Sequence, residues 1–240
     1  SLSIEKPLFM RYPGQSSAVS WRNFGRNRVA TLANPGRPFR TWLPGSGWPQ
    51  AFRNEEPPLR AELFSADQMA QHGAVLAASH VLAHGQAPDQ LLARLAENGS
   101  ILVDVCKLLT RAVADSRRIV PAGEWLLDNF YLIEEQIRMA KRLLPKGYSR
   151  ELPRLEDGAA GLAAGRPRVY DIALETVSHG DGRVDAESLA RFVAAYQTVA
   201  PLNLGELWAI PIMLRLAVIE NLRRVGVRIA AHESASSPTW

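Results

Sequence analysis

The segment from Pro121 to Tyr148 constrains the fold of this chain more than any other stretch. A proline opens it, and Pro145 followed by Gly147 closes it. These residues mark helix ends because proline has a fixed φ and lacks an N–H, whereas glycine tolerates the left-handed turn beyond a helix. The first half, GEWLLDNFYLI, is apolar nearly all round. A helix without a polar face is normally buried, so the pattern predicts a long central helix, called here the core helix.

Charged and polar groups are embedded in this apolar surround. A buried carboxylate is costly unless it is paired and hydrogen-bonded, so these groups need partners. Glu134 stands four residues before Arg138, the favourable orientation for a pair within a helix, and Arg215 is a candidate partner for Asp128 or Glu135. We predict a buried structural or interface network made of Glu124, Trp125, Asp128, Asn129, Tyr131, Glu134, Glu135, Arg138 and Arg215.

An alternative interpretation is a catalytic row, because Glu124, Asp128 and Glu135 lie on one helix face. Aligned carboxylates can hold a metal or carry out acid–base chemistry, including glycoside hydrolysis. Helical carboxylate metal proteins, however, use a Glu-x-x-His motif, and the core helix contains no histidine. We therefore favour the ion-pair network and predict no catalytic, cofactor-binding or metal-binding residue in this chain.

Periodicity and capping signals predict an all-α fold of about six or seven helices around two strongly apolar helices. The second apolar helix begins at a capping box formed by Asn203 and Glu206, contains Arg215 and Glu220, and should be kinked by Pro211. A second capping box, Ser65 with Gln68, opens a helix that should run to His84. The remaining helices are expected at 87–99, after Ser100, at 168–178, and at 186–199 with Asp185 as its cap.

The first 58 residues differ from the rest in composition. Residues 1–54 contain eight basic residues and one acidic residue, a net charge of +7, whereas the chain as a whole carries +4. The segment is rich in Arg, Pro, Gly and aromatic residues without a helical or strand period. We predict three parts: a basic irregular arm at 1–58, a helical domain at 59–232 and a frayed polar tail at 233–240. The arm has no nucleic-acid signature, although contact with a membrane surface or a protein partner stays open.

Other candidate sites have weaker signals. His80 and His84 are one helical turn apart, as metal ligands can be, but a third ligand is missing nearby, so hydrogen-bonded or solvated histidines are favoured. Cys106 is predicted to be a buried, unreactive thiol, and Asp104 to pair with an arginine. The KGYSREL stretch after the core helix is either an ordered turn or a partner-contacting segment. No run of about 18–20 uninterrupted apolar residues is present to span a bilayer, so this chain is expected to be a soluble piece of something longer.

Three strings, GEWLLDNFYLIEEQIR, LPKGYSRELPRL and VYDIALETVSHGDGRVD, carry a family resemblance. The chain from about Leu59 to about Ala230 resembles the N-terminal region of cyclic β-1,2-glucan synthases, which are large bacterial membrane glucosyltransferases. The resemblance implies a parent activity that transfers glucose from UDP-glucose, with a divalent metal, at the cytoplasmic face of the inner membrane. Its partners would be the glucosyltransferase and membrane region of the same parent protein.

The catalytic motifs of such a transferase are absent from this chain. It contains no pair of aspartates two residues apart and no Arg-Trp dipeptide, so no catalytic residue is transferred from the family. The expected function is a non-catalytic helical scaffold beside the transferase. The alternatives are a free-standing helical interaction module with an Arg-rich arm and, less favoured, an active site on the carboxylate face.

Overall fold

The computed structural model describes residues 56–84, 89–156 and 165–235, all within the unit Gly47–Trp240. These residues form seven α-helices and a short 3-10 helix, with two isolated bridges and no strand, which confirms the all-α prediction. The elements are α2 (Ala66–Ser79), α3 (Gln90–Ala114), α4 (Pro121–Asp128), α5 (Phe130–Leu143), η4 (Tyr148–Arg150), α6 (Arg168–His179), α7 (Ala186–Val199) and α8 (Leu204–Ala235). None of these helices is both long and apolar enough to cross a bilayer.

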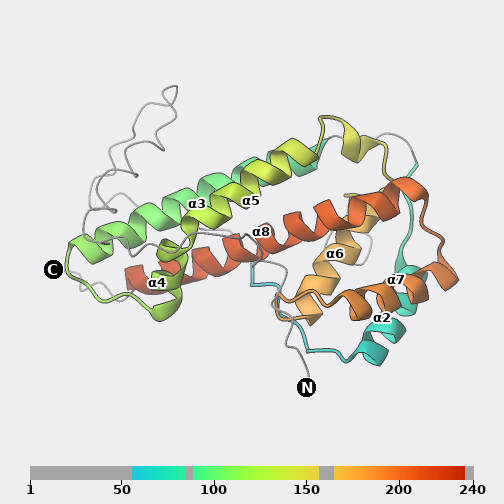
Figure 1. Cartoon of the computed structure of the whole chain (residues 1–240), viewed down its shortest axis with the longest axis horizontal. Coiled ribbons are helices and arrows are strands. Elements are labelled where there is room, and N and C mark those ends of the chain that lie inside the picture. Colours follow the sequence, from blue (N-terminus) through green and yellow to red (C-terminus); the bar gives the residue numbers. More distant parts are fainter. Residues whose placement is uncertain (1–55, 85–88, 157–164, 236–240) are drawn as a thin grey trace, which may run out of the picture. The chain divides into compact units, whose positions relative to one another are not determined.

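The longest helix, α8, connects the other helices. It begins at the predicted capping box: the Asn203 side chain accepts from the Glu206 N–H at 2.8 Å, and the Glu206 carboxylate accepts from the Asn203 N–H at 2.9 Å. From there α8 packs against α3, α4, α5 and α6 (Figure 1). Pro211 lies inside α8 on its exposed side. The helix continues through this proline to Ala235, although the prolyl nitrogen can donate no hydrogen bond to the preceding turn.

The most completely buried helix is α6, not the predicted core helix. Eleven of its twelve residues are buried, and the remaining one, Glu175, is partly buried. Its polar residues Arg168, Asp171, Glu175 and His179 are each partnered by groups from neighbouring elements. The sequence VYDIALETVSH therefore has polar residues inside the protein because each finds a hydrogen-bonding partner there.

The predicted core helix is in fact two helices, which is a correction to the sequence-based prediction. The chain breaks at Asn129 between α4 and α5, and the Asn129 side chain donates to the Trp125 carbonyl at 2.8 Å. An asparagine that bonds to nearby backbone competes with the helical ladder. In α5 only a narrow stripe is buried, namely Ile133, Ile137 and Ala140. The apolar residues of this segment thus divide between the protein interior and solvent, and Figure 1 shows α5 alongside α3 and α8 at the outside of the bundle.

Helix α3 joins what the sequence predicted as two helices. The expected exit at Asn98-Gly99 lies in the middle of a 25-residue helix. Asn98 is buried and donates to the Glu220 carboxylate at 2.8 Å. A Cβ at Gly99 would lie 3.6 Å from the Ile137 side chain of α5, an ordinary van der Waals distance. The buried contact of Asn98 with Glu220 therefore overrides the usual preference of this dipeptide for a helix end.

Helix α2 starts as predicted and ends early. The Ser65–Gln68 capping box is present, with both of its hydrogen bonds. The helix stops at Ser79, not at His84, because His80 is extended and its ring is held by Tyr196 at 2.8 Å and Asp171 at 3.0 Å. Helix α2 pairs with α7, and the Asp185 side chain caps α7 as predicted.

A buried carboxylate connects α8 to α3. Glu220, fully buried, accepts from Arg94 at 2.7 and 2.9 Å, from Arg223 at 2.8 Å and from Arg224 at 2.9 Å. Burial favours the neutral acid, but hydrogen bonds and charge from Arg94 and Arg223 outweigh it and hold the Glu220 pKa well below its usual range. Glu56 also pairs with Arg94 and Arg223, so three guanidinium groups share two carboxylates here.

The helical domain extends beyond its predicted boundaries at both ends. Glu56 and Pro57, assigned to the arm, contact α8 through Arg223 and Arg224. At the other end α8 runs to Ala235, and the buried Glu233 carboxylate accepts from the Val120 N–H at 2.9 Å. The first residues of the predicted tail are thus helical. Residues 1–55 of the predicted arm and residues 236–240 of the tail lie outside the described residues.

Candidate functional site

The nine residues of the predicted network do not form a buried cluster. Glu124, Asp128, Glu135 and Arg138 are exposed, while Asn129 and Glu134 are partly buried. Trp125 and Tyr131 have more than half of their surface in solvent, at 54% and 55%. The prediction that Asp128 is buried is wrong. The reason is geometric: the break at Asn129 turns this surface outward.

Arg215 also has a different partner from the one predicted. Its Nε donates to the Gln136 side chain at 3.0 Å, not to Asp128 or Glu135. In the described part of the chain no ion pair joins Glu134 or Glu135 to Arg138. Asp104 likewise pairs with Lys107 at 3.1 Å instead of an arginine. The Asp104–Lys107 pair is exposed, so water screens it and it contributes little to stability.

The carboxylate face does not have the form of an acid–base site either. A hollow on α5 is lined by Glu135, Arg138, Met139 and Arg142, and so contains one carboxylate beside two guanidinium groups. Glycoside hydrolysis generally uses two carboxyl groups on opposite sides of the scissile bond. This hollow therefore gives no support to the carboxylate-row alternative.

A second surface hollow lies at the turn after α5. The hollow has a volume of about 420 Å³ and is lined by residues 145–148, 150 and 151. Gly147 adopts a positive φ of 84°, which its lack of a Cβ permits. Asp89, at the start of α3, accepts from the Gly147 N–H at 2.7 Å and from the Ser149 hydroxyl at 2.6 Å. Partial burial of Asp89 favours its neutral form, but these hydrogen bonds prevail and lower its pKa.

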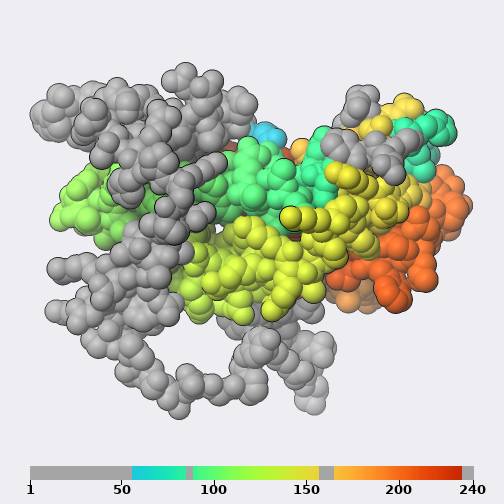
Figure 2. Space-filling view, turned by 90° about the horizontal axis from the view of Figure 1, so that it is seen from above, coloured from blue at the N-terminus to red at the C-terminus, as the bar shows by residue number. Residues whose placement is uncertain are grey.

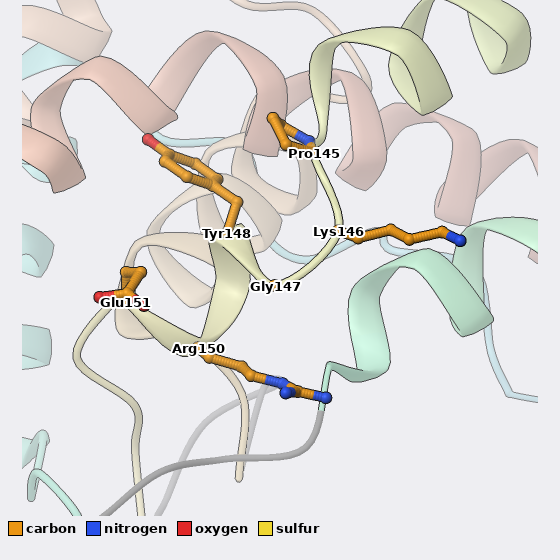
Figure 3. Close-up of a pocket in the computed structure, with 6 residues that line it drawn as sticks. All are labelled: Pro145, Lys146, Gly147, Tyr148, Arg150 and Glu151. Atoms are coloured by element: carbon orange, nitrogen blue, oxygen red, sulfur yellow. The ribbon is translucent and has the colours of Figure 1, made fainter.

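The Asp89 carboxylate therefore fixes KGYSREL as an ordered turn. Lys146 and Arg150 extend from it in directions away from Tyr148, as Figure 3 shows. Tyr148 points toward α8, and its hydroxyl donates to the Gly205 carbonyl at 3.2 Å.

Two large apolar side chains are exposed in the first turns of α8, where Tyr148 bonds to the Gly205 carbonyl. Leu204 and Trp208, four residues apart on α8, share a helix face and are 67% and 75% exposed. We call Leu204, Trp208 and Tyr148 the α8 entry patch. In the space-filling view the α5 end and its turn, in yellow, lie against the orange-red atoms of α8 (Figure 2). Trp208 is the most exposed large hydrophobic residue described, and tryptophan is enriched at the centres of protein interfaces.

The predicted histidine pair is not brought together as ligands. His80 is buried between Asp171 and Tyr196, as the hydrogen-bonded interpretation predicted, whereas His84 is exposed. His72 instead lies beside Glu175 and His179 of α6, with ligand atoms within 4.8 Å of one another. The sequence spacing gave no signal for this group because α2 and α6 are about a hundred residues apart.

Cys106 is buried and unpaired, as predicted. Burial, and then the nearby Glu134 charge, raise the pKa of its thiol to about 12. It is therefore not a nucleophile at neutral pH.

Sequence reasoning missed several buried ion pairs. Arg168 forms a two-pronged pair with Glu206 at 2.6 and 2.8 Å and also donates to the Pro201 carbonyl at 2.7 Å. The embedded charge of Glu220 and the arginines three and four residues later were visible as a local signal. Nothing in the local sequence indicated that Arg94 or Arg168 would complete these pairs.

The chain is similar in sequence to part of a much longer protein. It is 36% identical over 172 residues to the cyclic beta-(1,2)-glucan synthase NdvB of Rhizobium meliloti (strain 1021). The matched region is 71% of this chain and 6% of the relative, so the chain spans a small part of that protein's length. No protein-family model matches the chain. The resemblance predicted from the sequence is confirmed: this chain is related to a region of a cyclic β-(1,2)-glucan synthase.

Proposed function

We propose that this chain is a non-catalytic helical N-terminal region of a cyclic β-1,2-glucan synthase and acts as a scaffold for its glucosyltransferase. The observation that carries the proposal is the 36% identity to a synthase over most of this chain and only 6% of the relative's length. A region of this size within so long a protein has neighbouring parts of the same polypeptide to contact.

The described residues support a structural role over a chemical one. The motifs of a processive glucosyltransferase are absent from the sequence. Glu124, Asp128 and Glu135 of α4 and α5 are exposed and form no paired-acid arrangement. The best-connected polar groups, around Glu220 and Arg168, are internal cross-links between helices. UDP-glucose and its divalent metal belong, in this proposal, to other parts of the parent synthase.

We assign the docking of those other parts to the α8 entry patch. Leu204 and Trp208 offer apolar area beside a turn that is already ordered by Asp89. A pre-ordered surface loses little conformational entropy on binding. The parent would carry this region at the cytoplasmic face of the inner membrane, and the basic arm could add contact with the membrane surface.

The test compares the isolated chain with the intact parent synthase in membranes. Hydroxyl-radical footprinting should oxidise Trp208 in the isolated chain and leave it protected in the synthase. Trp125 on α4 is the matched control, because it is also an exposed tryptophan and lies outside the patch. Equal oxidation of Trp208 in both forms would overturn the docking assignment.

A second test measures the activity of substituted parent synthases. Trp208→Ala in the parent synthase should reduce glucosyl transfer from UDP-glucose, while Trp125→Ala should not. Before either experiment, an immunoblot of fractionated source cells should show a very large membrane-bound band. A band near 26 kDa outside the membranes would instead favour the free-standing interaction module.

A further inference from the structure

His72, Glu175 and His179 form a compact group that joins two helices. Glu175 and His179 are one turn apart on α6, and His72 comes from α2. The Glu175 Oε2 lies 2.9 Å from the His72 Nε2 and 3.2 Å from the His179 Nε2. Within the described ranges this is the group of three possible ligands whose donor atoms lie within 4.8 Å of one another.

The contacts of His179 determine which of its ring nitrogens carries a hydrogen. Its Nδ1 lies 2.7 Å from the Glu62 backbone carbonyl, which can only accept, so Nδ1 carries the hydrogen. In a neutral imidazole the Nε2 then carries a lone pair and can only accept a hydrogen bond. It faces the Glu175 Oε2, which is also an acceptor. Two acceptors at this distance need a positive charge between them, either a proton or a metal cation.

The Glu62 carbonyl is also the kind of group that supports a metal ligand. A histidine that binds a metal generally donates its other ring N–H to a carbonyl or carboxylate, which fixes the tautomer and the ring orientation. Here that partner is already in place.

Aromatic rings hold both imidazoles in position. Phe64 stacks on His179 with ring centroids 3.8 Å apart and planes 12° apart, and Phe192 lies parallel to His72 at 6.0 Å. The two imidazole centroids are 4.8 Å apart. The ligand atoms are therefore brought together by packing from α2, α6, α7 and the segment before α2.

The spacing suits a small tetrahedral ion. Ligand atoms about 2.0–2.1 Å from zinc at tetrahedral angles lie roughly 3.3 Å from one another. The two separations to Glu175 are close to this value, and all three donor atoms lie within 4.8 Å of one another. The side chains of His72, Glu175 and His179 are 24%, 13% and 9% exposed, so an ion can reach the group from solvent and would be largely shielded after binding.

We propose that His72 Nε2, His179 Nε2 and the Glu175 carboxylate bind a divalent transition-metal ion of the zinc type. Two imidazoles and one carboxylate are a ligand set suited to Zn²⁺, with water in the fourth position. Binding requires the His72 hydrogen to move to Nδ1, so that both Nε2 lone pairs face the ion. The ion would cross-link α2 to α6 and, through the pairing of α2 with α7, hold this end of the domain together.

The experiment uses the full chain after treatment with a chelator and dialysis. Isothermal titration calorimetry with Zn²⁺ should show one equivalent bound per chain. The melting temperature of the chain should be higher with Zn²⁺ than without it. Co²⁺ should give a visible absorption spectrum indicating tetrahedral nitrogen and oxygen ligation. The variants are Glu175→Gln, which keeps the side-chain volume, and His72→Gln. The control is His84→Ala, an exposed histidine outside the group.

Each outcome decides the proposal. The proposal is supported if Glu175→Gln and His72→Gln each bind Zn²⁺ at least about 10-fold more weakly than the wild type. The affinity of His84→Ala for Zn²⁺ should be unchanged. Melting curves recorded without metal show whether each variant is folded, so that unfolding is not mistaken for loss of ligation. A folded wild-type chain that binds neither ion would overturn the proposal, and so would variants that bind as the wild type does. The result has no bearing on the scaffold proposal, which rests on different residues.

Discussion

At the scale of single residues, burial separates carboxylates that look alike in the sequence. Asp128 and Glu220 both lie in apolar stretches, but Asp128 is exposed and Glu220 is fully enclosed by Arg94, Arg223, Arg224 and Asn98. Local sequence shows that a charge is embedded among apolar residues. It does not show which side of the helix faces water once the chain bends.

This contrast yields a prediction about stability. Glu220→Ala should lower the free energy of unfolding by about 3–5 kcal/mol, because buried guanidinium groups would lose their counter-charge. Asp128→Ala is the control and should leave it unchanged within about 0.5 kcal/mol. Urea denaturation followed by circular dichroism measures both. Equal effects of the two substitutions would contradict the assigned burial.

A second residue-scale prediction concerns the thiol. Cys106 is enclosed in α3 and its pKa is raised to about 12, so both the access of a reagent and the thiolate fraction are low. A thiol-specific chromogenic reagent at pH 8 should react only as fast as the domain unfolds, and at once in concentrated guanidinium chloride. Immediate reaction with the native chain would show that Cys106 is accessible.

At the scale of elements, two glycines show how close packing decides whether a helix position tolerates a side chain. In α2 a Cβ on Gly73 would lie 2.6 Å from the Phe192 carbonyl oxygen of α7. In α3 a Cβ on Gly99 would lie 3.6 Å from the nearest Ile137 atom, an ordinary contact distance. The first glycine permits two helices to approach, whereas the second only weakens its own helix.

The same change at these two sites should have opposite effects. Gly73→Ala should destabilise the domain by about 1–3 kcal/mol, because the α2–α7 pair must move apart. Gly99→Ala should stabilise it by about 0.5–1 kcal/mol through helix propensity. The midpoints of thermal unfolding report both. If Gly73→Ala is as stable as Gly99→Ala, then α2 and α7 do not pack this closely.

At the scale of the whole molecule, the described helices are held by a few buried charge clusters as well as by apolar packing. Glu220 links α8 to α3, Arg168 links α6 to α8, and the side chain of Asp171 links α6 to His80. Such clusters tie together segments that are distant in sequence. They also make the stability of the domain depend on keeping its acids ionised.

Acid should therefore unfold the domain. The pKa of Glu220 in the folded protein lies below its usual range, so its contribution to stability is complete above its unfolded-state pKa of about 4.3 and is lost as the pH falls through the folded value. Asp89 and Asp185, whose pKa values are also lowered, act in the same direction. The free energy of unfolding measured between pH 7 and pH 2 should decrease below about pH 4. The decrease should be smaller in Glu220→Gln, and an identical pH profile in that variant would rule out this role of Glu220.

The sequence by itself determined the fold class, the caps at Ser65, Asp185 and Asn203, the burial of Cys106 and the relation to a cyclic β-1,2-glucan synthase. These depend on neighbouring residues or on long matching strings, which can be seen along one chain. Only the tertiary structure decided that α6 is the most buried helix, that Asn98-Gly99 continues α3, and that the α8 entry patch and the His72 group exist. Each of these brings together residues from different helices, and their free energy comes from contacts that no local pattern records.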